Sequence, residues 1–389
     1  MKILELCEGY PGYNGLLGSN FVKTRNFYYK KEGLNDITVL NFELPNGSYE
    51  FEEIKVISLS EYKQSYKDIS FDVLVCHAAN VRSHYQFLKK YQTLFPKVVF
   101  FFHGHEVLSI NKEYPKPYPY QKKMGLSFYI RPIYDRIKFR IWHNYFIKQS
   151  SNVHLVFVSK WIQLKFEEYI KIDLSSIQAQ SHLISNGISH VFETEEYDID
   201  GEKEYDFITI RPDLDEPKYA VDVVNNLAHA NPQYKFLLVG KGEFFKHFKK
   251  AGNIEQIERF LSHDEILLLL NKSRCALMPT KNDTQGIMAC EMATFGMPTI
   301  TSDIDVCKII FDGYPNVRFI SNDDSSINLS GIIPKPSKVK IKRYFYENTI
   351  VKEVELLNEL GGGKFEEVRF IAAVLLLNLR NVTFRRRCA

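Results

Sequence analysis

Residues 283–300 read DTQGIMACEMATFGMPTI, and this stretch carries the clearest structural signal in the chain. Gly286 comes just before an apolar run, and Gly296 and Pro298 come just after it. A glycine at the end of a helix and a proline shortly beyond it are typical stop signals, so the pattern predicts a helix over residues 287–295. Apolar segments at 274–278 and 298–301 flank it. The stretch therefore predicts a strand, a loop, a helix and a second strand.

The start of this predicted helix has the chemistry of an anion site. The first amide groups of a helix have no partner within it, so those of Ile287 and Met288 would be free to meet a diphosphate. Glu291 follows one turn later, with its side chain tilted back toward the helix start. A carboxylate at that position can accept hydrogen bonds from the two hydroxyl groups of a ribose. An acidic residue favoured there only by the helix dipole is an equally weighted alternative.

Apolar strands and helical segments alternate along the rest of the chain, in two series separated by the acidic stretch 193–204. The first series has predicted strands at 2–6, 37–42, 55–59, 73–76, 98–102 and 153–158. The second has predicted strands at 206–210, 235–239, 257–260, 274–278 and 298–301. Strands separated by helices favour parallel sheets that are covered on both faces. We therefore expect an α/β protein with two Rossmann-like domains, at 1–195 and 200–340, followed by helices and a tail of unassigned role at 341–389.

Length and composition exclude several other classes. The chain has 389 residues, 45% of them hydrophobic and 25% charged, as in an ordinary globular protein. No apolar run reaches the roughly 18 residues that a membrane span needs, and residues 1–5 lack the apolar core of a signal peptide. A net charge of +3 gives no bulk attraction to nucleic acid. The six cysteines are scattered, which indicates buried thiols in a reducing compartment. We therefore expect a cytoplasmic protein.

Residues 283–300 resemble the Glu-x7-Glu signature of retaining GT-B glycosyltransferases, family 4 in particular. The sequence keeps Gly286, Glu291, Gly296 and Pro298 of that signature, but it has Asp283 where the first glutamate is usual. Other landmarks of the family follow in the same order along the chain. They are His-Gly at 103–104, Val-Ser at 158–159, Asn-Gly-Ile at 186–188 and the Gly-x-Gly turn at 240–242. The resemblance spans about residues 1–350.

The resemblance implies a GT-B fold, in which two Rossmann-like domains face each other across a cleft. It also implies retaining transfer of a hexose-like sugar from a UDP- or GDP-linked donor to a glycan or lipid-linked acceptor, as in surface polysaccharide biosynthesis. The donor would bind in the C-terminal domain and the acceptor in the N-terminal domain. No cofactor and no metal are expected, because arginine, lysine and helix amides can stabilise the leaving diphosphate.

The resemblance also assigns roles to individual residues. Glu291 would hold the ribose, and the backbone of Gly286, Ile287 and Met288 would meet the diphosphate and the sugar. Asp283 would face the donor sugar, His103 would touch the sugar or a phosphate, and Gly15 would approach the diphosphate from the other domain. Arg211 and Lys218 would neutralise the leaving diphosphate. Simpler interpretations remain open for three of them: a tight turn at Gly15, a solvated Lys218 and a structural His103.

Two alternative functions remain. One is a nucleotide-sugar isomerase on the same architecture. The other is a glycosyltransferase-like partner subunit that binds without transferring. Asp283 at the first signature position favours this second alternative, as does an Arg211 to Lys218 spacing two residues longer than usual.

Residues 111–148 combine basic and aromatic side chains. Nine basic residues, among them Lys122, Lys123, Arg136 and Arg140, stand against two acidic ones. Basic charge beside amphipathic aromatics suits an anionic membrane surface, which would make the protein peripheral to the inner face of the cell membrane. A solvated basic face over a packed aromatic core is the alternative. The tail beyond Gly361 could serve as a membrane-surface helix, a partner helix or a non-native extension.

Overall fold

A computed structural model of the chain describes residues 1–12, 20–121, 125–324 and 327–362. Gly15, Lys122, Lys123 and the tail from residue 363 therefore lie outside the described residues. The chain divides into two compact units. In the described residues, the first comprises 1–12, 20–101, 151–155 and 350–362, and the second comprises the rest of 102–349.

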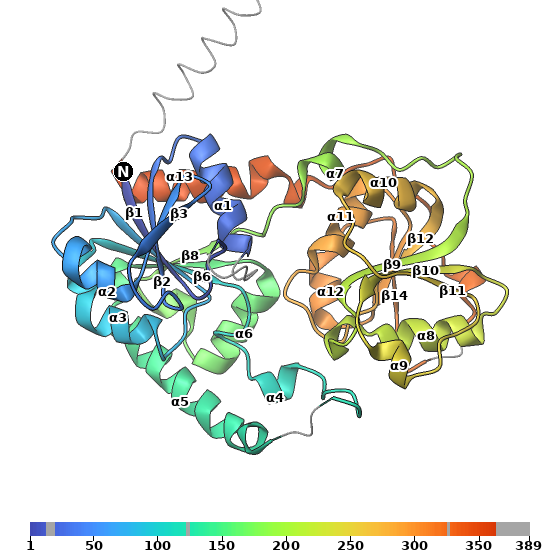
Figure 1. The fold of residues 1–389 in the computed structure, drawn as a ribbon, viewed down its shortest axis with the longest axis horizontal. Helices are drawn as coiled ribbons and strands as arrows, with labels where there is room; N and C mark the ends of the chain where they lie inside the picture. The colour runs from blue at the N-terminus through green and yellow to red at the C-terminus, as the bar shows by residue number, and fades with distance from the viewer. Residues whose placement is uncertain (13–19, 122–124, 325–326, 363–389) are drawn as a thin grey trace, which may run out of the picture. The chain divides into compact units, whose positions relative to one another are not determined.

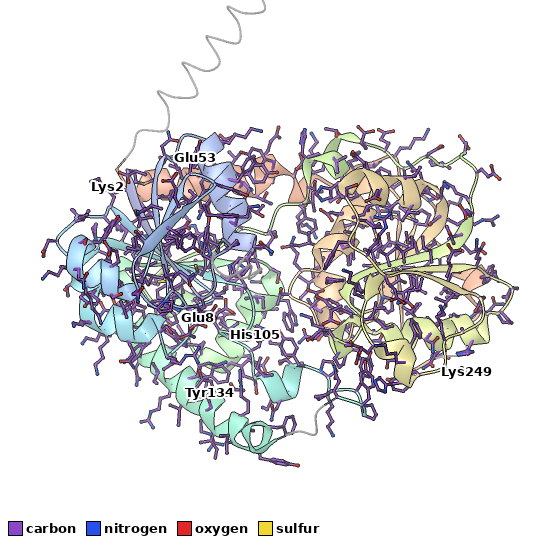
Figure 2. The ribbon with its side chains drawn as sticks, viewed as in Figure 1. Lys2, Glu8, Glu53, His105, Tyr134 and Lys249 are labelled. Carbon is purple, nitrogen blue, oxygen red and sulfur yellow. The ribbon has the colours of Figure 1, made fainter. Side chains whose placement is uncertain are left out.

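In the described residues, the first half of the chain builds an eight-stranded sheet. Its strands, in spatial order, are β3 (Ser48–Phe51), β4 (Ile54–Ile57), β2 (Asp36–Asn41), β1 (Lys2–Cys7), β5 (Val73–His77), β6 (Lys97–Phe102), β7 (Val153–Phe157) and β8 (Gln180–Leu183). The strands β4, β2, β1, β5 and β6 pair in parallel, while β3 pairs with β4 in the antiparallel sense. In Figure 2, Lys2 marks where β1 begins and Glu8 lies beyond its carboxyl end.

The helices of the first unit are α1 (Asn20–Lys31), α2 (Leu59–Glu61), α3 (His84–Tyr91) and α13 (Ile350–Leu360). Helix α13 returns from the far end of the chain and packs on α1. A buried ion pair joins the two helices, because the guanidinium of Arg25 donates to both carboxylate oxygens of Glu353 over 3.1–3.2 Å. The hydroxyl of Tyr29 donates to the same carboxylate over 2.7 Å. The last helix of the described chain, α13, is thus held to the first helix, α1.

The second unit contains a six-stranded sheet. Its order is β11 (Ile254–Ile257), β10 (Phe236–Lys241), β9 (Tyr205–Asp213), β12 (Ser273–Leu277), β13 (Thr299–Ser302) and β14 (Val317–Ile320), and every pair is parallel. In the view of Figure 1, α8 (Val221–Ala230) and α9 (Phe244–His247) lie below this sheet, and α10 (His263–Asn271) and α11 (Ile287–Phe295) lie above it. The parallel α/β class expected from the sequence is therefore confirmed.

In the second sheet, the strands that follow β9 in the sequence are added first on one side of β9 and then on the other. The next strand, β10, lies on one side of β9, and β12 lies on the other side. In open α/β sheets, ligands bind beyond the carboxyl ends of the strands at such a switch point. The fold therefore points to the carboxyl ends of β9 and β12, next to the start of α11.

The remaining helices of the second unit are α4 (Ile110–Glu113), α5 (Leu126–Lys148), α6 (Lys160–Ile170), α7 (His190–Thr194) and α12 (Asp305–Ile310). Within the described ranges, no helix combines the length and the apolar character that crossing a bilayer requires. Five of the six cysteines lie in these ranges, and all five are buried free thiols. The interpretation of these five as buried thiols is confirmed.

One predicted helix matches the structure, and one predicted strand does not. Helix α11 spans Ile287–Phe295, as predicted. The strand predicted at 257–260 was wrong, because β11 spans Ile254–Ile257. Ile254 is buried and pairs with Phe236 of β10, whereas Phe260 is 66% exposed in a loop. The apolar side chain of Phe260 made a loop resemble a strand end.

Candidate functional site

A cavity of about 330 Å³ lies at the carboxyl edge of the second sheet. The ends of β9 and β10, the segment before α10, α10 itself and the start of α11 contribute to its wall. The lining residues are Ile210, Arg211, Pro212, Val239, Gly240, Lys241, Arg259, Phe260, Leu261, Ile266, Ile287, Met288 and Glu291. Four residues predicted for donor binding, Arg211, Ile287, Met288 and Glu291, are therefore brought together here.

Arg211 supplies a buried positive charge to this cavity. Its Nη2 donates to the carbonyl oxygen of Pro279 over 2.6 Å, but its Nε has no hydrogen-bond partner among the described residues. Burial lowers the pKa of the guanidinium, and the charge of Asp283 opposes that shift. An arginine nevertheless stays protonated in proteins, so its charge must be balanced by something. A buried cation with an unused donor favours an anionic ligand.

Gly240 allows β10 to approach the backbone of Arg211 closely. Its φ of 154° lies in a region that side chains disfavour. A Cβ atom at this position would lie 2.3 Å from the carbonyl oxygen of Arg211 and 2.7 Å from the side chain of Leu214. Any residue other than glycine would therefore displace the strand end that carries Arg211.

Glu291 also lines the cavity, one turn into α11. Its side chain is almost fully buried, and its Oε1 accepts the amide of Ser189 over 2.9 Å. Burial raises the pKa of the carboxyl group to about 7, while the hydrogen bond from Ser189 opposes the shift. The carboxylate accepts this hydrogen bond from the protein, and it can accept further hydrogen bonds from a ligand in the cavity.

The start of α11 is held by Asp283. Its Oδ1 accepts the amides of Thr284 over 2.7 Å, of Gln285 over 3.3 Å and of Gly286 over 2.9 Å. Gly286 itself has a φ of 69° at the junction with the helix. Within the described residues, the amides of Ile287 and Met288 donate no hydrogen bond. Asp283 thus orders the loop, and it leaves the two first helical amides facing the cavity region.

Lys218 is the second residue of the predicted cation pair. It does not line the cavity, but its Nζ and the guanidinium carbon of Arg211 lie 4.9 Å and 5.2 Å from the ring centre of Tyr219. The loop that carries both cations is also fixed at Asp215, which accepts the hydroxyl of Tyr120 over 2.6 Å. Two cations at one aromatic ring indicate that the longer spacing from Arg211 to Lys218 still brings them to one place.

His103 follows β6 and lies in the second unit. Its amide and that of Gly104 both donate to the carboxylate of Glu106, the second over 2.8 Å. A Cβ atom at Gly104 would lie 2.8 Å from Thr284, so the loop after β6 lies beside the loop that carries Asp283. The structure thus brings the loops of two predicted catalytic residues together, and their catalytic roles remain predictions.

His105, two residues further on, has a side chain whose pKa is shifted by its surroundings. Its ring stacks on Tyr114 at 5.3 Å with an interplanar angle of 7°. Burial lowers the pKa of His105, and the positive charge of Lys218 lowers it further. The neutral imidazole is therefore favoured beside the predicted phosphate-binding lysine.

Lys241, Arg259 and Phe260, which form a rim of the cavity, were not predicted as site residues from the sequence. The ring of Phe260 is largely exposed, and the Nζ of Lys241 lies 4.7 Å from its centre. A flat, exposed aromatic ring beside a cavity suits stacking of a base. The available signal was Ser262 with Glu265, which form a capping box at the start of α10 and therefore place residues 258–261 in a loop.

The second unit also contains a segment that is similar to a known protein family. A sequence model of the family described as glycosyl transferases group 1 matches residues 209–329, which contain Arg211, Lys218, Asp283 and Glu291. No curated protein matches the chain significantly by sequence.

Several solved structures are similar over nearly the whole chain. Sucrose-phosphate synthase from Thermosynechococcus elongatus has a TM-score of 0.61 at 11% identity, over 98% of this chain and 100% of that chain. An α,α-trehalose-phosphate synthase (UDP-forming) from Burkholderia xenovorans, in complex with glucose-6-phosphate, has a TM-score of 0.58 at 10% identity, over 93% and 100%. Anabaena HepE in complex with UDP and glucose has a TM-score of 0.53 at 14% identity, over 84% and 87%. At such identities the likeness shows the fold.

Proposed function

We propose, on the premise that this chain is a transferase of the GT-B fold with a glycosyl transferases group 1 segment at 209–329, that it transfers a hexose-like sugar from a UDP- or GDP-linked donor with retention of configuration. The acceptor would be a glycan or a lipid-linked glycan, as in surface polysaccharide biosynthesis. The proposal rests on the chemistry of the cavity at the ends of β9 and β10.

The observation that carries the proposal is the pairing of Arg211 with Glu291 in one cavity. Arg211 offers an unused donor and a buried positive charge, which suit a diphosphate. Glu291 offers a buried acceptor, which suits the hydroxyl groups of a ribose. A nucleoside diphosphate carries both a diphosphate and a ribose with hydroxyl groups, so it could contact Arg211 and Glu291 at once. The exposed ring of Phe260 at the rim would stack on the base.

The same groups would promote the departure of the nucleotide. Breaking the bond between a sugar and a diphosphate builds negative charge on the leaving phosphate. Arg211, Lys218 and the amides of Ile287 and Met288 are fixed before the reaction, so they would stabilise that charge without reorganising. We propose that these groups suffice and that the reaction needs no metal ion.

A panel of nucleotide-sugars tests the proposal. The full chain is incubated with each donor, with and without glycan acceptors, and the released nucleotide is measured. We expect release from a UDP- or GDP-linked donor that an acceptor accelerates. Calorimetry with UDP and GDP measures binding separately, and a protein that binds neither nucleotide nor nucleotide-sugar would contradict the proposal.

One observation favours the partner-subunit alternative, in which the chain binds without transferring. The Oδ1 of Asp283 is occupied by three backbone amides, which is a structural role for a residue that the resemblance places beside the donor sugar. Nucleotide-sugar binding without nucleotide release, in the presence of every acceptor tested, would support that alternative. Epimerised sugar formed without an acceptor would instead indicate an isomerase.

A further inference from the structure

Helix α5 is apolar on two different sides. One side packs in the core through Trp142, Tyr145 and Phe146, all of them buried. A second side carries large apolar side chains that are largely exposed. They are Tyr129, Ile130, Ile133, Tyr134 and Ile137, with exposed fractions from 41% to 67%. We refer to these five residues as the α5 ridge.

The α5 ridge forms one continuous face. Its members recur at intervals of one, three and four positions, which a helix with 3.6 residues per turn places on one side. Figure 2 labels Tyr134, one of the five residues. Single exposed apolar residues need no explanation, but a gathered set of this size is typical of an interaction surface.

A cavity of about 690 Å³ borders the ridge along the same helix. Its walls come from α4, α5, α6 and the residues that flank them. The lining residues are Ser109, Lys112, Pro132, Asp135, Arg136, Phe139, Arg140, His143, Glu168, Tyr169, Ile170 and Lys171. Arg136 and Arg140 follow Ile133 and Ile137 by three residues each, so they lie next to the ridge on the helix surface.

The cavity has an excess of positive charge. Its two acidic residues already have partners, since Asp135 lies 3.4 Å from both Arg131 and Lys138, and Glu168 lies 2.8 Å from Lys165. Arg136, Arg140 and Lys171 form no ion pair within the part of the chain that the structure describes. An anionic group is therefore the ligand that this cavity complements.

We propose that α5 docks on an anionic lipid bilayer, with the ridge entering the interface and a headgroup phosphate occupying the cavity. A bilayer surface offers phosphate groups directly beside acyl chains, and here cations lie directly beside exposed isoleucines. Apolar burial and attraction to anionic lipids together set how strongly such a surface binds. This proposal deepens the proposed function. It rests on that function in one respect, which is that the enzyme would bind a lipid-linked acceptor at this surface.

Other aromatic residues of the same basic segment do not belong to this surface. Tyr118 packs against Phe244 and Phe248 in the core of the second unit, and its hydroxyl donates to Asp222 over 3.1 Å. Tyr120 stacks on His247 at 4.1 Å. The membrane surface expected over the whole of residues 111–148 is therefore narrowed to α5 and its cavity.

Vesicle binding by the full chain tests the proposal. Vesicles of phosphatidylcholine, with and without phosphatidylglycerol, are sedimented with the wild type and with Arg136→Gln/Arg140→Gln. Each basic residue contributes about fivefold in affinity at an anionic surface, so the double variant should bind roughly 30-fold more weakly. Ile133→Ser/Ile137→Ser should weaken binding by about tenfold or more, because it removes apolar burial.

Matched variants control for charge and for exposure. Lys249→Gln/Lys250→Gln removes the same charge from an exposed site far along the chain, where Figure 2 labels Lys249. Leu94→Ser/Leu268→Ser removes two exposed apolar side chains that lie outside the ridge. Both controls should bind vesicles as the wild type does. All variants keep residues 363–389, so any contribution of Arg385–Arg387 is the same throughout.

Calorimetry with monomeric short-chain phosphatidylglycerol probes the cavity alone, with inorganic phosphate as the comparison. The lipid should bind to the wild type and not to Arg136→Gln/Arg140→Gln, and inorganic phosphate should bind more weakly. Equal binding of inorganic phosphate and lipid, or vesicle binding unchanged in both α5 variants, would overturn the proposal. UDP and GDP binding, measured on the same samples, reports on the nucleotide cavity and so separates a failure here from a failure of the proposed function.

Discussion

Glu291 has opposing effects on stability and on ligand binding. Its pKa is about 7 in the fold against an ordinary value of 4.5, so the folded protein holds a proton there that the unfolded chain loses. Stability contributed by the neutral carboxyl group is complete below pH 4.5. It declines as the pH rises toward 7 and is lost above it, where a charge must be kept buried.

We predict that Glu291→Gln stabilises the ligand-free protein at pH 8, by up to about 3 kcal/mol, because an amide cannot ionise. At pH 5 the two proteins should differ little. Scanning calorimetry at both pH values measures the melting temperatures. A variant that melts below the wild type at pH 8 would show that the buried charge costs nothing.

The same variant should bind nucleotide more weakly. Replacing a charged acceptor of two ribose hydroxyls costs about 1.5–3 kcal/mol, which is roughly ten- to a hundredfold in affinity. In the wild type, hydroxyl donors favour the carboxylate, so binding at pH 6.5 should release a proton that the variant does not release. Calorimetry in buffers of different ionisation enthalpy detects this proton. Unchanged affinity would remove Glu291 from the site.

Arg211→Ala should slow sugar transfer by roughly a hundredfold or more, since it removes a fixed donor to the leaving phosphate. Arg318→Ala, at an exposed position of β14, is the matched control and should leave the rate unchanged. Nucleotide release measured for both variants, with and without EDTA, is the test. Activity abolished by EDTA and restored by a divalent ion would contradict metal-free chemistry.

The elements that the sequence predicted well are those with clear boundaries. Both ends of α11 were predictable, because Gly286 and Gly296 adopt the left-handed backbone conformation that flanks the helix and Pro298 cannot continue it. Helix α5 was not predicted, because its apolar residues face both the core and the solvent and Pro132 interrupts the pattern. The rim of the cavity was not predicted, and neither were the correct bounds of β11. The rim residues, Lys241, Arg259 and Phe260, lie at a strand end or in a loop, where the sequence has no periodicity that could indicate them.

The close approach of β9 and β10 gives a prediction for Gly240. Gly240→Ala should lower stability by about 1–3 kcal/mol, because its Cβ would overlap the carbonyl oxygen of Arg211. Nucleotide affinity should fall with it, since the strand end that carries Arg211 must move. Gly252→Ala, which has no atom within 4 Å of its Cβ, is the control. Melting temperatures and UDP or GDP calorimetry measure both effects, and equal behaviour of the two variants would contradict the steric argument.

At the scale of the whole molecule, the sequence indicated two strand–helix series but not where the last helix packs. Helix α13 lies in the first unit, although 328 positions separate Glu353 from Arg25. The pattern of apolar residues within one helix shows which face is buried, but it does not indicate which other element that face packs against. This long-range closure therefore became visible only in the structure.

Glu353→Ala should destabilise the first unit by about 3–5 kcal/mol, because it removes the buried carboxylate to which the guanidinium of Arg25 donates. Glu359→Ala, at an exposed position of the same helix, should cost little. The double variant Arg25→Met/Glu353→Met should recover most of the loss, since it removes both charges. Scanning calorimetry of the three variants is the measurement, and a mild effect of Glu353→Ala would mean that water reaches Arg25.

The closure by α13 also sets an order of events while the protein is being made. A ribosome adding about 5–20 residues per second needs on the order of 20–60 seconds to travel from Arg25 to Glu353. Throughout that interval the guanidinium on α1 lacks the carboxylate of Glu353, so the first unit stays unfinished. Residues 156–349 emerge meanwhile with their own complete sheet. We therefore expect the part of the chain that is translated first to be the last to reach its native fold.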